Sequence, residues 1–127
     1  MNRQIIITEN APNSPLYSQG VRAGSTIYVS GMVGIDPATG ELAGPSIQDQ
    51  TRQALRNCEA ILFAGGSTLA DVTFVTVLLA HPDDFAGMNE AYSQVFSQLP
   101  PARAVARLGP DLPGILVSMT VTAHTDS

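Results

Sequence analysis

Residues 72–79, Val-Thr-Phe-Val-Thr-Val-Leu-Leu, restrict the fold more than any other segment of the chain. Their β-branched and aromatic side chains predict a strand. Successive side chains of a strand point to opposite faces, so Val75 and Leu79 lie on one face and Phe74 and Leu78 on the other. Such a strand belongs in the middle of a sheet whose two faces are both covered.

Two segments have the apolar spacing of amphipathic helices. The first begins at Ser46, a suitable N-cap with Asp49 in a capping-box position, and ends at Gly65-Gly66. The second runs from Phe85 to Leu99 and is ended by two prolines. The single cysteine, Cys58, falls within the apolar stripe of the first helix, which favours a buried structural thiol over a nucleophile.

The remaining elements complete one α+β domain spanning residues 1–127. Further strands are predicted at residues 5–8, 17–22, 26–34, 102–108 and 115–123. The order is β-β-β-α-β-α-β-β, which suits two helices packed on one face of a mixed sheet. Two helices cannot cover both faces, so we expect a homo-oligomer in which sheet faces pack together.

Composition excludes several classes of function. The 6 basic residues are all arginine, so Schiff-base chemistry on lysine and a P-loop lysine are absent. The net charge of −5 disfavours nucleic-acid binding. His81 and His124 are far apart in sequence and Cys58 is alone, so we expect no metal site. The lone cysteine and the lack of a membrane or targeting segment predict a cytoplasmic protein.

Three residues suggest an anion-binding site. Asn89 lies on the apolar stripe of the second helix, where a buried amide either fixes a neighbouring strand or lines a pocket. Arg103 and Arg107 share one face of a predicted strand with Val105 between them. Either arginine is a solvated edge charge or a clamp whose two parallel donors match a carboxylate. The alternation of residues along the strand does not show which of the two arginines would bind an anion.

The hydroxyl groups of Tyr17, Ser30 and Ser118 each have an ordinary structural explanation near a strand. No G-x-S-x-G motif surrounds Ser30, which disfavours a serine hydrolase. No G-x-G-x-x-G motif follows a strand, so dinucleotide binding has no support.

Several motifs, in this order and spacing, resemble the Rid/YjgF family of small imine and enamine deaminases with a chorismate-mutase-like fold. They cover most of the chain and comprise residues 8–12 (Thr-Glu-Asn-Ala-Pro), 15–20 (Pro-Leu-Tyr-Ser-Gln-Gly), 29–31 (Val-Ser-Gly), 36–41 (Asp-Pro-Ala-Thr-Gly-Glu), 84–85 with 88–92 (Asp-Phe, Met-Asn-Glu-Ala-Tyr), and 101–104 (Pro-Ala-Arg-Ala).

The resemblance implies a homotrimer with three clefts between subunits. It selects Arg103 over Arg107 as the group that binds the substrate carboxylate, and it places Tyr17, Ser30 and Asn89 near the cleft. Gly31 and Val105 are expected to contact the substrate as well. The substrates would be 2-imino or 2-enamino acids. Water adds to the iminium carbon, a 2-oxo acid and ammonia leave, and no cofactor is required.

The chain departs from the family pattern at two positions. Val105 replaces a cysteine often found two residues after the arginine, and Ser118 replaces the usual glutamate of the last strand. A serine can orient a water but cannot replace a carboxylate as a base. We therefore consider three hypotheses for the function. The protein is a deaminase, or a relative that binds small carboxylates or acts on another C=N substrate, or a ribonuclease, which the negative net charge disfavours.

Overall fold

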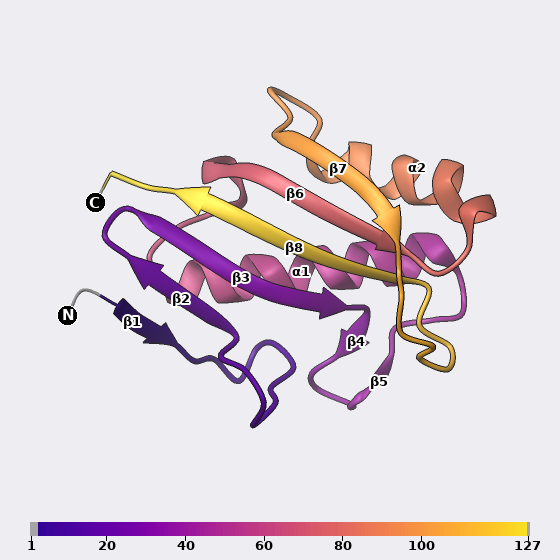
Figure 1. Cartoon of the computed structure of the whole chain (residues 1–127), viewed down its shortest axis with the longest axis horizontal. Coiled ribbons are helices and arrows are strands. Elements are labelled where there is room, and N and C mark those ends of the chain that lie inside the picture. The colour runs from indigo at the N-terminus through magenta and orange to yellow at the C-terminus, as the bar shows by residue number, and fades with distance from the viewer. Residues whose placement is uncertain (1–2, 127) are drawn as a thin grey trace.

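The computed structural model describes residues 3–126, and it folds into a six-stranded sheet with two α-helices on one of its faces (Figure 1). The sheet order is β1-β2-β3-β8-β6-β7. The main elements are β1 (Arg3–Ile6), β2 (Gly20–Ala23), β3 (Thr26–Val33), α1 (Ile47–Ala64), β6 (Val72–Leu79), α2 (Phe85–Val95), β7 (Ala102–Arg107) and β8 (Val117–His124). Within these residues, no helix combines the length and apolar character needed to cross a bilayer.

The sheet is mixed, as predicted. Strands β1, β2, β3, β8 and β6 pair antiparallel in that order, whereas β7 pairs parallel with β6 at the edge. Helix α2 connects these two parallel strands, which a tight turn could not join. The predicted α+β architecture with both helices on one face is therefore confirmed.

One face of the sheet forms the core with α1 and α2. The alternation in β6 is as predicted, because Val75, Val77 and Leu79 are buried. Helix α1 buries Cys58 and Leu62 in the same cluster. The cluster also includes Ile27, Val29, Leu55, Ile61, Met88, Val117, Met119, Val121 and Ala123.

The opposite face of the sheet has no covering element within the described chain. Tyr28 is 54% exposed there and Phe74 is 41% exposed, and Thr120 and the alanines of β7 are exposed as well. These side chains share the face because Tyr28 and Phe74 both pair with Thr122 of β8. The expected packing of this face against another copy stays a prediction.

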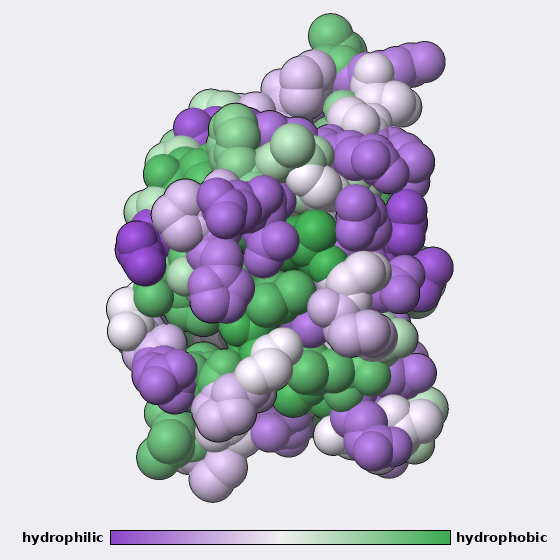
Figure 2. All heavy atoms as spheres, turned by 90° about the vertical axis from the view of Figure 1, so that its right-hand side faces the viewer, coloured by the Kyte–Doolittle hydropathy of each residue, from purple (hydrophilic) through white to green (hydrophobic). Residues whose placement is uncertain are grey.

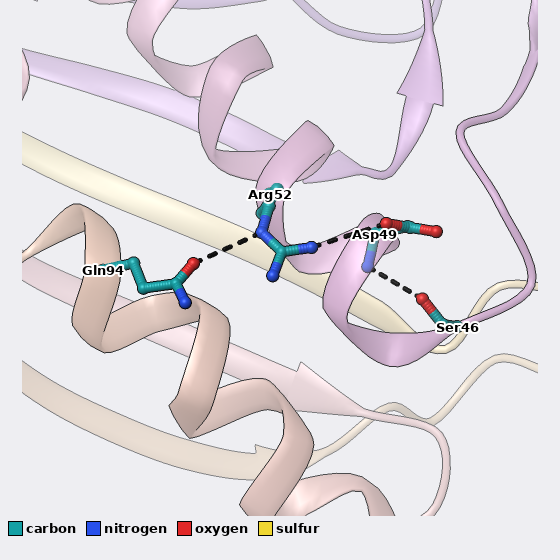
Figure 3. Close-up of polar contacts among 4 residues, drawn as sticks. All are labelled: Ser46, Asp49, Arg52 and Gln94. Carbon is teal, nitrogen blue, oxygen red and sulfur yellow. Dashed lines mark hydrogen bonds and ion pairs between the residues drawn. The ribbon is translucent and has the colours of Figure 1, made fainter.

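Polar contacts at the start of α1 explain where the helix begins and how it meets α2 (Figure 3). The Ser46 hydroxyl accepts a hydrogen bond from the backbone N–H of Asp49 at 3.0 Å, which confirms Ser46 as the N-cap. Arg52 then joins Asp49 and Gln94 of α2, donating to a side-chain oxygen of each at 3.4 Å.

Several element boundaries differ from the predicted ones. The first two strands are Arg3–Ile6 and Gly20–Ala23 rather than 5–8 and 17–22, so Tyr17 lies in the loop between them. The last strand begins at Val117 rather than at residue 115. Helix α2 stops at Val95 rather than at Leu99, because Phe96 leaves the helical region (φ −106°, ψ 61°). Leu99, which precedes a proline, has a φ of 47° and is therefore not helical.

A small hairpin of β4 (Ile35–Asp36) and β5 (Glu41–Leu42) was not predicted from the sequence. Its turn was predicted as a turn cluster, and Gly40 takes a φ of 76° there, which a residue without a side chain adopts readily. Two-residue strands carry no periodic signal, so only the turn was detectable.

Candidate active site

Arg103 projects from the edge strand β7 toward α2. It pairs with Val75 of β6, which is buried beneath the helices, so Arg103 lies on the helix-bearing side of the sheet. A guanidinium nitrogen of Arg103 donates a hydrogen bond to the side-chain oxygen of Asn89 at 2.7 Å. Its central carbon lies 4.8 Å from the ring centroid of Tyr92 and 5.9 Å from that of Phe85.

Helix α2 supplies all three contacts from one face. Phe85, Asn89 and Tyr92 are spaced four and three residues apart, which places them in a row along the helix. The amide holds the guanidinium at its edge and the two rings provide cation–π contacts. Asn89 uses one of five guanidinium donors, so most remain for a ligand. No carboxylate among residues 3–126 pairs with Arg103.

Phe85 and Tyr92 are two further residues around Arg103 that were not predicted from the sequence as site residues. Tyr92 is 7% exposed, and its hydroxyl has no hydrogen-bond partner among the described residues. Burial raises the pKa of Tyr92, and the positive charge of Arg103 partly counteracts this shift. The helical spacing of Phe85 and Tyr92 from Asn89 was the one sign in the sequence that the three side chains share a helix face. The same spacing is typical of an ordinary apolar stripe that faces the core, so it did not identify a site.

A hollow lies along the later part of β7 and shares Phe85 with the surroundings of Arg103. Val105 and Arg107 lie on the same side of the strand as Arg103, because they pair with Val77 and Leu79. The hollow has a volume of about 330 Å³ and is lined by Leu79, Pro82, Phe85, Val105, Ala106 and Arg107. Figure 2 views the molecule from the right-hand side of Figure 1 and shows apolar groups gathered between hydrophilic ones on that face.

Ser30, Gly31 and Ser118 form a second cluster on the other side of the sheet. Two residues of β3, Ser30 and Gly31, stand between the positions that pair with Met119 and Val121 of β8, which is a β-bulge. A Cβ atom on Gly31 would lie 3.0 Å from the Ser118 hydroxyl oxygen. A side chain at residue 31 would therefore crowd the Ser118 hydroxyl, and Ser118 is itself only 9% exposed.

The loop that carries Tyr17 is fastened to this cluster. The Ser30 hydroxyl donates to the backbone oxygen of Ser18 at 2.6 Å. Gln19, buried at 1% exposure, donates to the backbone oxygens of Thr8, Ala11 and Pro12 and accepts from the N–H of Thr8. Tyr17 remains 48% exposed. Gln19 thus orders this loop through contacts that the sequence pattern does not predict.

The two clusters do not meet within one chain. Arg103 shares the helix-bearing side of the sheet with its partner Val75, whereas Ser118 pairs with Leu78 and points to the uncovered face. Asn89 and Val105 therefore join Arg103, and Ser30, Gly31 and the Tyr17 loop lie with Ser118. A single subunit cannot place all the predicted residues around one small ligand.

Cys58 takes no part in either cluster. It is fully buried on α1, and this burial raises the pKa of its thiol to about 12. The predicted structural role is confirmed. In residues 3–126 no three histidine, cysteine or acidic side chains are grouped so that they could hold a metal ion.

Comparison with known proteins gives the family. The family model described as Endoribonuclease L-PSP matches residues 8–125. The chain belongs to the Rid/YjgF family. A RutC family protein of Pyrococcus horikoshii is 43% identical over 98% of this chain and 99% of its own. The human 2-iminobutanoate/2-iminopropanoate deaminase is 43% identical over 80% of this chain and 75% of its own.

Solved structures of this family share the fold. Escherichia coli TdcF, solved with bound serine, superposes with a TM-score of 0.89 at 33% identity, covering 97% of this chain and 99% of its own. The resemblance expected from the sequence motifs is confirmed. This Rid/YjgF chain thus has relatives named as imine deaminases over most of its length.

Proposed function

We propose that this protein is a deaminase that hydrolyses 2-imino and 2-enamino acids to 2-oxo acids and ammonia. The observation that carries the proposal is the state of Arg103. Its guanidinium is exposed at a sheet edge, is held by Asn89 at 2.7 Å, and has no acidic partner among the described residues. A fixed, uncompensated guanidinium is suited to bind a planar carboxylate through two parallel hydrogen bonds.

The chemistry places few demands on the protein. Water adds to C2 of the iminium group and forms a C–O bond, giving a carbinolamine. A proton moves from oxygen to nitrogen, the C–N bond breaks, and the 2-oxo acid and an ammonium ion leave. Arg103 would orient C2 by holding the adjacent carboxylate. Ser118 would orient the water, since its neutral hydroxyl accepts and donates hydrogen bonds but is not a base.

A homotrimer with clefts between subunits would unite the two clusters. The uncovered sheet face carries exposed Tyr28 and Phe74, which a neighbouring copy could bury. In such an assembly Arg103 and Asn89 of one subunit would face Tyr17, Ser30 and the Ser118 region of another. The opposite orientation of Arg103 and Ser118 within one chain supports this arrangement.

The test is the decay of an imino acid generated in situ by an amino-acid oxidase, followed with and without the purified protein. We expect accelerated release of the 2-oxo acid, lost in Arg103→Ala and largely lost in Arg103→Lys, which keeps the charge but not the two-donor fork. Arg56→Ala on the exposed side of α1 is the matched control. Full activity of a folded Arg103→Ala protein would refute the proposed role of this arginine.

A second candidate is a small-carboxylate-binding protein without deaminase turnover, or an enzyme for another C=N substrate. Ser118 favours it, because no carboxylate stands at that position to activate water. A positioned acid–base group typically accelerates a reaction about 10²–10⁴-fold. Binding of 2-oxo acids without acceleration of imine decay would favour this second candidate.

A further inference from the structure

We propose that the site prefers 2-imino acids and 2-oxo acids that carry a second carboxylate at the far end of a short apolar chain. The inference rests on the role of Arg103 in the proposed function. Its basis is the apolar hollow along β7, which has Arg107 in its lining and is linked to Arg103 through Phe85, whose ring contacts that arginine.

The two arginines face the same way. Arg103 and Arg107 pair with Val75 and Leu79 of β6, both buried beneath the helices, so the arginines leave β7 on the same side. Four residues of strand separate their Cα atoms by about 13 Å. A substrate held by its 2-carboxylate at Arg103 can extend along β7 toward Arg107.

The path between the arginines is apolar. Val105 lies between them on the strand, and Leu79, Pro82 and Phe85 complete the wall. Phe85 connects the surroundings of the two arginines. Its ring centroid is 5.9 Å from the guanidinium carbon of Arg103, and Phe85 lines the hollow together with Arg107. Methylene groups of a substrate would be favoured here, and a polar uncharged chain would lose its hydration without compensation.

Arg107 is available for a second anion. Among the described residues it forms no ion pair and no side-chain hydrogen bond. His81 and Asp111 line an adjoining hollow with it, but Asp111 forms no ion pair with it. An arginine left uncompensated in a chain of net charge −5, at the end of an apolar hollow, is suited to a carboxylate. If Arg107 were only a solvated charge at the sheet edge, it would not make the protein discriminate between ligands with and without a second carboxylate.

The experiment compares two products of equal chain length, 2-oxohexanoate and 2-oxoadipate, which differ at the terminal carbon. Their dissociation constants are measured by calorimetry on the intact protein and on Arg107→Gln, Arg103→Gln and Arg56→Gln. We expect the wild type to bind 2-oxoadipate about tenfold more tightly than 2-oxohexanoate, as one additional charged hydrogen-bonded pair would give.

The variants identify the group responsible. Arg107→Gln should bring the ratio of the two dissociation constants near one, and Arg103→Gln should weaken the binding of both acids. Arg56→Gln removes the same charge elsewhere and should leave the ratio unchanged. Equal binding of the two acids by the wild type, or an unchanged ratio in Arg107→Gln, overturns the inference.

Turnover is measured separately, with imines made from norleucine and from 2-aminoadipate. A diacid preference in binding without any deamination would refute the proposed function while sustaining the ligand class. Deamination of both imines at equal kcat/KM, together with equal binding of the products, would sustain the proposed function and refute the diacid preference.

Discussion

Replacing Asn89 by aspartate tests whether Arg103 is the carboxylate-binding group. The side-chain oxygen of Asn89 accepts a hydrogen bond from Arg103 at 2.7 Å. Aspartate has nearly the same shape, so the variant places a negative charge at the same contact. The guanidinium charge is then compensated within the protein, and a substrate carboxylate must compete with an internal one.

The size of the effect follows from the exposure of the pair. Two unit charges 4 Å apart attract by about 1 kcal/mol in water and by about 4 kcal/mol at an effective dielectric constant near 20. Arg103 is exposed, so the value should lie near the lower limit. An increase in KM of about tenfold, equivalent to about 1.4 kcal/mol, is expected for Asn89→Asp.

Asn89→Ala is the matched comparison. It removes the contact that positions Arg103 but leaves the guanidinium charge uncompensated, so we expect a smaller increase of roughly threefold. The assay is the initial rate of imine decay over a range of imino-acid concentrations, with thermal unfolding of each variant as a check of the fold. If Asn89→Asp matches the wild type, or is less impaired than Asn89→Ala, the assignment of Arg103 as the anion site is wrong.

Three further predictions concern Ser118, Tyr92 and Cys58. Ser118→Glu should raise kcat for imine hydrolysis, by up to about 10²-fold, because it restores an acid–base group beside the water; an unchanged kcat in a folded variant would mean that this chain uses other groups. Tyr92→Phe removes a buried hydroxyl without a partner and should raise the free energy of unfolding in urea by about 1 kcal/mol; a loss of stability would reveal a partner for that hydroxyl in the assembled protein. Because burial raises the pKa of Cys58 to about 12, its thiol stays protonated at pH 8 and should resist alkylation until the protein is unfolded; rapid labelling of the native protein would contradict the buried position.

The elements with long periodic patterns were predictable. The helix from Ile47 to Ala64 follows from its apolar stripe, and Ser46 caps it as its residue type indicates. Strand β6 was predicted over its observed bounds because its residues alternate between two apolar faces. These features depend on neighbours within one or two helical turns or strand repeats, so the chain encodes them locally.

The short and irregular segments were not predictable in the same way. Tyr17 lies in a loop ordered by Gln19, whose bonds reach residues seven to eleven positions away. The bulge at Ser30 and Gly31 depends on what stands opposite it on β8. No local propensity encodes such contacts, because both partners come from segments that meet only when the sheet has formed.

Local patterns in the sequence are sufficient to predict the fold class and the family resemblance. The sequence also limits the chemistry, because the chain has no lysine and an anion must therefore be bound mainly by arginine or backbone amides. Contacts between distant segments establish how those residues are grouped. The register of β7 on β6 and the position of α2 place Asn89, Tyr92 and Phe85 around Arg103. The register of β8 on β6 places Ser118 on the opposite face, since strand side chains alternate and pairing determines which face each one takes.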